Sequence, residues 1–316
     1  MSEISIVSEI VKKIRSSIQE IIVGKDDQIN TAIIAILCRG HVLIDDVPGT
    51  GKTSLSKALA DSLDCSFNRV QFTPDLMPSD ILGVNIFDQK NSSFKFVEGP
   101  IFSQILLADE INRATPRTQS AMLEAMQERK VTVDGNTRNL PDPFMVIATQ
   151  NPIEMEGTFP LPESQIDRFM VRIQLGYPEH NEETQIYRRF MNESEIPVLK
   201  SVVNSKQLNK AVNLIPTVRV DDFIVKYIVD LIHTTRQGSG IKVGASPRAG
   251  LALYKTSQAL AALEGRDYVI PDDVKKMAVP VLSHRLILDS SAKLKGQTGE
   301  NFVEIVLSKL EVPISK

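Results

Sequence analysis

Between residues 41 and 175, short apolar runs alternate with stretches of helical periodicity. The runs have the length and composition of buried strands, and they are HVLID (41–45), FNRVQF (67–72), QILLAD (104–109), FMVIAT (144–149) and FMVRIQL (169–175). Between the first two, GKTSLSKALADSL (51–63) has apolar residues at helical spacing. Apolar strands that alternate with helices predict a parallel sheet covered by helices on both faces.

Two segments interrupt this alternation. VNIFDQKNSSFKFVEG (84–99) alternates apolar and polar residues around a polar centre, and KVTVDGNTRNL (130–140) contains the turn signal Asp134-Gly135. Both patterns predict β-hairpins that are inserted into the α/β framework.

After about residue 195, the strand pattern fades and helical periodicity dominates. DDFIVKYIVDLIHTTR (221–236) places apolar stripes on one face of a helix, and further helices are predicted in SPRAGLALYKTSQALAAL (246–263) and PDDVKKMAVPVLSHRLI (271–287). We therefore expect an α/β domain over residues 1–178, a linker over 179–195 and a small all-helical domain over 196–316.

Composition narrows the class of protein. With 316 residues, of which 42% are apolar and 24% charged, the chain has the composition of a globular protein with one or two domains. The formal net charge of −3 gives no general attraction to nucleic acid or to an anionic membrane. The N-terminal stretch is amphipathic, unlike a signal peptide, and no apolar run approaches a membrane span, so the cytoplasm is the expected location. Cys38 and Cys65 lack C-x-x-C spacing, which favours buried thiols.

The stretch HVLIDDVPGTGKTS (41–54) leads from a predicted strand through a glycine loop into a predicted helix, which is the setting of a phosphate-binding loop. Glycines in the loop would let successive backbone N–H groups point at phosphate oxygens. Lys52 is expected to reach the β- and γ-phosphates, and the Thr53 hydroxyl to ligate Mg²⁺. A glycine-rich turn with a solvated lysine is the alternative, and this context disfavours it. The residues expected at the nucleotide are Pro48, Gly49, Thr50, Gly51, Lys52, Thr53 and Ser54.

Asp46 stands where the usual loop pattern, G-x-x-x-x-G-K-[ST], begins with glycine. A carboxylate beside a polyphosphate would be repelled. Because position 46 is the last residue between the strand and the loop, we expect its side chain to point away from the nucleotide and to accept hydrogen bonds from loop N–H groups.

Two other predicted strands end in polar residues. ILLADE (105–110) ends in two carboxylates, of which Asp109 would hold the Mg²⁺ shell and Glu110 would activate the attacking water. Alone, such an ending is more often the polar start of a loop, but the glycine loop upstream makes it a strong indication. Asn151, which follows the strand in VIATQNP, is expected to place its amide between Glu110 and the γ-phosphate, although asparagine before proline is usually a turn residue.

Two arginines occupy the starts of predicted elements. Arg168 precedes the last strand, and Arg248 begins a helix of the second domain. Either could neutralise charge on a transferred phosphoryl group or be an ordinary surface arginine. Asp167 could equally be the ion-pair partner of Arg168.

Together these motifs resemble those of AAA+ ATPases, and more narrowly those of the MoxR family. The matching stretches are IVGKDDQI (22–29), DVPGTGKT (46–53), QFTPDLMPSDILG (71–83), GPIFSQILLADEINRATPRTQSAMLEAMQE (99–128), PFMVIATQNPIEMEGTFPLPESQIDRF (143–169) and GASPRAGLAL (244–253). The resemblance covers most of the chain. It implies a P-loop fold with a five-stranded parallel sheet sandwiched by helices, followed by a small all-α lid, in a ring that is commonly a hexamer.

The resemblance also implies roles for individual residues, with ATP and Mg²⁺ as ligands. These roles are Walker A for Lys52 and Thr53, Walker B for Asp109 and Glu110, sensor 1 for Asn151, the arginine finger for Arg168, sensor 2 for Arg248 and a border of adenine for Ile22, Val23 and Gly24. Arg168 would act on the phosphate of a neighbouring subunit, with Arg113 and Arg117 as alternatives. Arg248 could act within its own subunit or across the interface. The hairpins resemble inserts that face the pore or the client in related rings.

Three functions are compatible with these observations. The resemblance favours a Mg²⁺-dependent ATPase that acts as a chaperone-like remodeller in complex maturation or metal-cofactor insertion, with a protein client and a partner that carries a von Willebrand factor A domain. A nucleic-acid motor of the MCM type shares the inserts, but the sequence shows no basic stripe interleaved with aromatic residues, so nucleic acid is not the expected partner. A nucleotide-gated scaffold without turnover would not need Glu110, Asn151 and Arg168 together.

Overall fold

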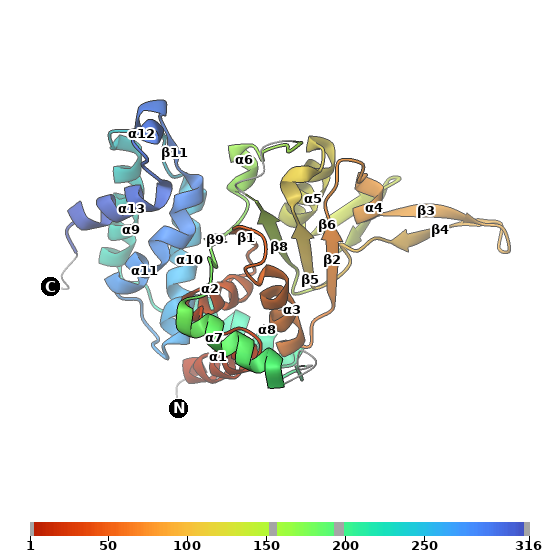
Figure 1. Ribbon diagram of the computed structural model, residues 1–316, viewed down its shortest axis with the longest axis horizontal. Helices are drawn as coiled ribbons and strands as arrows, with labels where there is room; N and C mark the ends of the chain where they lie inside the picture. The colour runs from red at the N-terminus through yellow and green to blue at the C-terminus, as the bar shows by residue number, and fades with distance from the viewer. Residues whose placement is uncertain (1–2, 152–156, 193–198, 313–316) are drawn as a thin grey trace.

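The computed structural model describes residues 3–151, 157–192 and 199–312. A central sheet carries helices on both faces, with a helical region at one end of the molecule and two hairpins at the other (Figure 1). The α/β fold and the helical lid predicted from the sequence are both confirmed.

Five parallel strands form the main sheet in the order β2-β5-β8-β1-β9. They are β1 (Val42–Asp45), β2 (Phe67–Gln71), β5 (Ile105–Asp109), β8 (Met145–Gln150) and β9 (Val171–Ile173). The chain leaves β1 to build one side of the sheet and returns to the other side of β1 for β9. As a result, the carboxyl ends of β1, β5 and β8 lie at one edge, where α/β sheets bind ligands.

Successive residues of the strands are buried on opposite faces. Ile105 and Leu107 belong to one apolar cluster, whereas Leu106 and Ala108 belong to the other. Beside the sheet, the first cluster includes residues of α1 (Glu3–Gln19), α2 (Asp26–Leu37) and α3 (Lys52–Ser62), and the second includes residues of α4 (Pro78–Leu82) and α5 (Pro116–Glu128). Because both faces are covered, the strands read as continuous apolar runs in the sequence.

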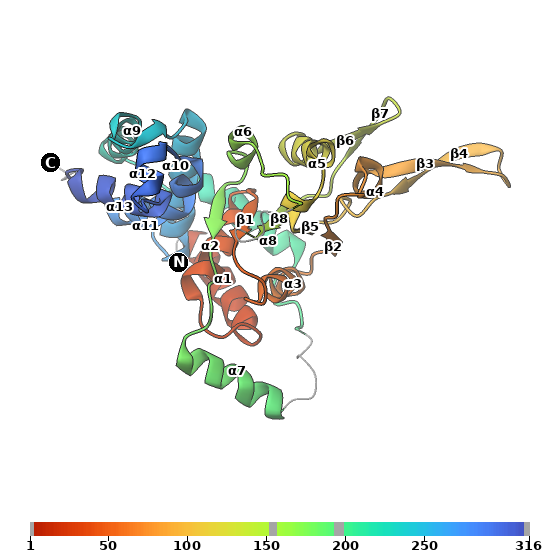
Figure 2. The ribbon, with the colours of Figure 1, turned by 45° about the horizontal axis from the view of Figure 1, so that its top comes forward.

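The structure contains an antiparallel hairpin in each of the two interrupting segments. The paired strands are β3 (Gly83–Asp88) with β4 (Ser93–Glu98), and β6 (Lys130–Val133) with β7 (Asn136–Asn139). Both hairpins project from the same side of the body (Figure 2). The Asn85 amide donates to Asp134 Oδ2 at 2.6 Å, and the Arg138 guanidinium lies 3.7 Å from the centre of the Phe96 ring. The hairpins therefore brace each other.

The lid is mainly helical. Its elements are α8 (Ser205–Leu214), η2 (Ile215–Thr217), α9 (Asp222–Gln237), α10 (Pro247–Leu263), α11 (Pro271–Leu282), η3 (Ser283–Arg285), α12 (Ser290–Leu294) and α13 (Gly299–Lys309). It also contains an antiparallel ladder of β10 (Ile241–Val243) and β11 (Ile287–Leu288), which are too short to show a strand pattern in the sequence. No helix among the described residues has the length and apolar character needed to cross a membrane.

One apolar core continues from the sheet into the lid. It includes Ile14 of α1, Ile33 of α2, Leu231 of α9 and Leu253 of α10. Helix α1 contacts α3, α8 and α10, so the lid rests on the N-terminal helices. Helix α7 (His180–Asn192) occupies most of the expected linker, of which 193–195 lie outside the described residues. The domain limits given above stay a prediction.

His41 joins three elements at the start of β1. Its Nδ1 accepts the N–H of Val146 at 2.9 Å, and its Nε2 lies 3.1 Å from the carbonyl oxygen of Met126. An accepting Nδ1 carries no proton, so the neutral ring donates from Nε2 to Met126. Burial, with a smaller effect of the Arg129 charge, lowers the pKa of His41 to about 4.

We predict that the protein loses stability as the pH falls from about 7.5 to 5. The unfolded chain protonates this histidine near pH 6.5, whereas the folded chain resists protonation down to about pH 4. Protons therefore favour the unfolded state in this window, by about 2 kcal/mol at pH 5. Denaturant unfolding at several pH values measures the slope. His41→Gln removes one titrating group and should reduce the slope, although not abolish it, because burial also lowers the pKa of His284. An unchanged slope would show that other groups set the pH dependence.

Candidate functional site

The glycine loop joins β1 to α3 at the carboxyl edge of the main sheet. Gly49 and Gly51 have φ values of 82° and 89°, a region that residues with side chains rarely adopt. Apart from the adjoining residues of the chain, no heavy atom of a described residue lies within 4 Å of the point where a Cβ would stand at either glycine. The loop backbone therefore borders open space, which fits a phosphate group held by N–H groups at the start of α3.

The predicted loop residues 48–54 form one continuous turn into α3. Lys52 is the first residue of that helix, and its Nζ donates to the carbonyl oxygen of Asp46 at 2.8 Å. The Thr50 hydroxyl donates to the carbonyl oxygen of Val47 at 3.2 Å. The lysine is thus folded over the loop, where an ammonium group can meet a phosphate.

The Asp46 carboxylate fastens the loop by accepting backbone N–H groups, of which one belongs to the loop, as predicted, and two belong to the segment after β9. Its Oδ1 accepts the N–H of Val47 at 2.8 Å, and its Oδ2 accepts those of Leu175 and Gly176 at 2.7 Å each. Asp46 is only 7% exposed. Three charge-assisted hydrogen bonds therefore tie the beginning of the loop to the segment that follows β9.

Asp109 and Glu110 stand at the end of β5. Asp109 Oδ1 accepts the Thr149 hydroxyl at 2.6 Å, and Oδ2 pairs with Arg69 Nη2 at 2.6 Å. Glu110 has left-handed backbone geometry, with φ of 55°, and its N–H donates to the same Thr149 oxygen at 2.8 Å. Thr149 of β8 thus fixes the two acidic residues relative to each other.

The Glu110 carboxylate is held by its own chain. Its Oε2 accepts from Gln71 Nε2 at 2.7 Å and from Arg113 Nη1 at 2.9 Å. Gln71 ends β2, and Arg113 ends the short turn η1 (Ile111–Arg113). Arg113, one of the alternatives for a role in a neighbouring subunit, is therefore engaged within its own subunit.

Arg69, Gln71 and Thr149 were not identified from the sequence. Their positions follow from the register of the strands. Gln71 of β2 pairs with Asp109, and Thr149 of β8 lies beside Asp109, one residue beyond the last aligned pair of β5 and β8. Arg69 shares a face of β2 with Gln71, since side chains two apart on a strand point the same way. Thr149 could have been identified from the sequence by aligning the carboxyl ends of the predicted strands 104–109 and 144–149. The polar sequence of β2 gave no such indication.

Two further parts of the predicted site are Asn151 and the segment 22–24. Asn151 is buried directly after β8, whose last residue, Gln150, pairs with Asp45 of β1. The asparagine therefore lies at the same sheet edge as the glycine loop. Ile22, Val23 and Gly24 are partly buried in the link between α1 and α2, and their contact with adenine stays a prediction.

The two arginines lie on neighbouring segments of the sheet and the lid. Arg168 is between α6 (Glu163–Ile166) and β9, and Arg248 is exposed in the first turn of α10. Within the described part of the chain, neither guanidinium has a hydrogen bond or an ion pair. The alternative that Asp167 pairs with Arg168 is wrong, because Asp167 accepts from Arg285 Nε at 2.8 Å.

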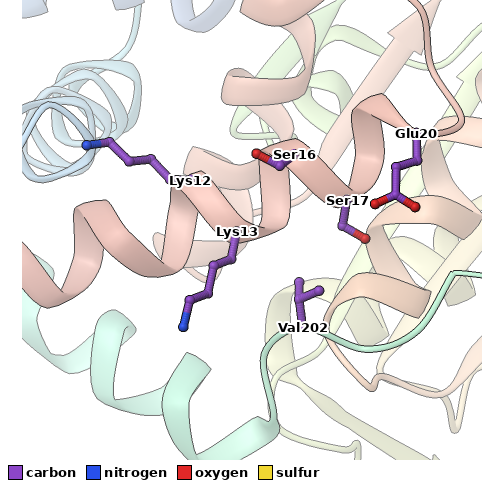
Figure 3. Close-up of a pocket in the computed structure, with 6 residues that line it drawn as sticks. All are labelled: Lys12, Lys13, Ser16, Ser17, Glu20 and Val202. Carbon is purple, nitrogen blue, oxygen red and sulfur yellow. The ribbon is translucent and has the colours of Figure 1, made fainter.

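A hollow of about 550 Å³ lies elsewhere, between α1 and the segment before α8. Its lining residues are Lys12, Lys13, Ser16, Ser17, Glu20 and Val202. Figure 3 shows that the side chains of Lys12 and Lys13 extend in different directions, so their charges do not converge on one ligand. No predicted site residue lines this hollow, and the glycine-loop edge is the candidate site.

Comparisons with known proteins agree with this location. Residues 41–171 match a family described as "ATPase family associated with various cellular activities (AAA)", and residues 233–306 match the AAA lid domain. The chaperone MoxR1 of Mycobacterium tuberculosis is 40% identical over 306 residues, which cover 94% of this chain and 80% of that protein. The uncharacterized protein YeaC of Bacillus subtilis is 46% identical over 299 residues, which cover 95% of this chain and 93% of that protein. A crystal structure of a protein from Cytophaga hutchinsonii, named as a candidate ATPase, matches with a TM-score of 0.92 at 38% identity. The match covers 99% of this chain and 97% of that one.

We predict that Asp46→Asn lowers the free energy of unfolding by about 2–4 kcal/mol. The amide has nearly the same size but only one accepting oxygen, so its NH₂ group must face at least one backbone N–H that now donates to the carboxylate. Chemical denaturation followed by circular dichroism measures the change.

Asp45→Asn is the matched control at the neighbouring position. Burial raises the pKa of Asp45 in spite of the Arg172 charge, so the fold destabilises the charged form of this side chain relative to water. Arg172 also keeps its ion pair with Glu300. The control should therefore cost much less stability, and equal losses for the two variants would contradict the role given to Asp46.

Proposed function

The chain belongs to the MoxR family of AAA+ ATPases, and from that premise we propose that it hydrolyses ATP with Mg²⁺ as one subunit of a ring, commonly of six. The proposal rests on one observation: the glycine loop, Asp109 and Glu110 lie at the same edge of the sheet. The open space beside Gly49 and Gly51 supports phosphate binding at that edge.

In this proposal the loop N–H groups and Lys52 bind the β- and γ-phosphates, and Thr53 and Asp109 hold Mg²⁺, which neutralises phosphate charge when bound. Glu110 orients the attacking water and accepts its proton. Gln71 and Arg113 both donate to Oε2 of Glu110, so they hold the carboxylate in place while Oε1 can accept from the water. Asn151, buried at the same edge, is suited to orient that water.

We assign the charge-stabilising role across the subunit interface to Arg168. Its guanidinium has no partner among the described residues of its own chain, whereas Arg113 is paired with Glu110. A guanidinium beside a developing phosphoryl charge stabilises the transition state, and a neighbouring subunit can supply it. Arg117 is exposed and stays an alternative, and Arg248 would act from the lid, within its subunit or across the interface.

Chaperone-like remodelling of a client protein is the biological role that we propose. The name of the relative, chaperone MoxR1, supports it. Phe87 and Phe94 on the β3–β4 hairpin are 54% and 74% exposed, which suits contact with a protein client. Complex maturation or metal-cofactor insertion, a partner with a von Willebrand factor A domain and a cytoplasmic location rest on resemblance alone. Packing between the hairpins accounts for Arg138, which lies over the Phe96 ring, and the nucleic-acid motor stays the alternative.

We predict that Glu110→Gln binds ATP within a few-fold of the wild type but lowers turnover by about a hundredfold or more, because the amide cannot accept the proton of water. Nucleotide titration and steady-state phosphate release measure the two quantities. Lys52→Ala should weaken binding itself. Wild-type turnover in Glu110→Gln would show that the role given to Glu110 is wrong, and absence of turnover in the unmodified protein would favour the scaffold alternative.

We further predict that Arg168→Ala is inactive alone and regains activity when mixed with Glu110→Gln subunits. Each Arg168→Ala subunit keeps an intact Glu110, and a Glu110→Gln neighbour supplies the missing arginine. Phosphate release across a series of mixing ratios measures the recovery. An absence of recovery at every ratio would count against action in a neighbouring subunit.

A further inference from the structure

Arg285 of the lid holds the backbone on both sides of Arg168. Its Nε donates to Asp167 Oδ1 at 2.8 Å, and its Nη2 donates to the carbonyl oxygens of Phe169 at 2.7 Å and Asp167 at 3.3 Å. Its Nη1 donates to the carbonyl oxygen of Met170 at 3.2 Å. One guanidinium therefore contacts the residue before Arg168 and the two residues after it.

Two other lid residues reach the same segment. His284 Nε2 lies 3.1 Å from the carbonyl oxygen of Phe169, and the Ser246 hydroxyl lies 3.4 Å from Asp167 Oδ2. Ser246 is the N-cap of α10, whose first turn carries Arg248. The segment 167–170 is thus held from η3 and from the start of α10, and both elements belong to the lid.

The contact pattern of Arg285 differs from that of a simple ion pair. Its side chain is 3% exposed, and burial lowers the pKa of Arg285 while the Asp167 carboxylate opposes that change. Such burial is tolerated because the guanidinium donors are bonded, mostly to backbone carbonyls. A planar guanidinium spans several acceptors in fixed directions, which a lysine ammonium cannot do. The side chain therefore fixes the shape of a backbone segment as well as its distance from the lid.

We propose that Arg285 is a positioning residue for Arg168. By holding residues 167–170 against the lid, it presents to the neighbouring subunit the Arg168 guanidinium, which has no partner among the described residues. A movement of the lid then shifts Arg168 as well, so the lid of one subunit controls hydrolysis at the nucleotide of the next. This inference rests on the proposed action of Arg168 in a neighbouring subunit.

The test uses Arg285→Gln in the full-length, assembled protein. We expect turnover to fall about tenfold or more while ATP affinity, measured by nucleotide titration, stays within about threefold. Mixing with Glu110→Gln subunits should restore activity, because those subunits carry an intact Arg285 and Arg168. Arg285→Lys should rescue only part of the loss. If the turnover of Arg285→Gln equals that of the wild type, the inference is wrong.

The matched control is Arg266→Gln, since Arg266 forms another partly buried lid pair, with Asp273, at the opposite end of α10. It should lower the melting temperature without changing turnover per folded subunit. Asp167→Asn gives a second variant if Arg285→Gln does not fold, and it should show the same recovery on mixing.

The mixing experiment distinguishes failure of the role given to Arg285 from failure of the role given to Arg168. If Arg168→Ala recovers with Glu110→Gln subunits and Arg285→Gln or Asp167→Asn does not, the lid residue acts only within its own subunit and the inference fails. If Arg168→Ala itself does not recover, the proposed action across the interface fails and the inference falls with it. Recovery of both classes of variant supports the inference.

Discussion

The three hydrogen bonds of the Asp46 carboxylate are the constraint on which the site depends. A loop with two left-handed glycines is costly to order, because glycine loses more conformational freedom on folding than any other residue. The carboxylate ties the first residue of this loop to Leu175 and Gly176. Since these residues follow β9 directly, the position of the loop is set jointly by β1 and by the last strand of the sheet.

Strand β9 therefore connects the loop to the lid. Just after the strand, Asp46 accepts the N–H groups of Leu175 and Gly176, and just before it Arg285 holds residues 167–170. In the middle, Arg172 pairs with Asp45 at 3.3 Å and with Glu300 in the first turn of α13. Buried ion pairs contribute little net stability because desolvation offsets their attraction, but they do specify geometry. The three contacts fix β9, although it is only three residues long, between the glycine loop and the lid.

The parts of the site that lie within one strand–loop–helix unit could be predicted from the sequence. The glycine loop, Asp109 and Glu110 follow apolar runs, and parallel strands bring such endings to one edge. Contacts between distant segments could not be predicted. The Asp46 carboxylate meets residues about 130 positions later in the chain, and Arg285 meets a segment more than 110 positions earlier. No local pattern encodes such partners, since they depend on strand order and on how the lid packs.

The charges at the sheet edge explain why so many of its polar groups are already bonded. Asp45, Asp46, Asp109 and Glu110 bring four carboxylates to the edge where we propose that a nucleotide binds. Backbone N–H groups satisfy Asp46, and arginines pair with the other three. An incoming nucleotide meets a largely neutralised edge, where repulsion is weak. The same pairing leaves Oε1 of Glu110 able to accept from water, because Gln71 and Arg113 both donate to Oε2. The resting contacts therefore reduce the charge of the edge and still leave Glu110 an oxygen for the water that the proposed hydrolysis requires.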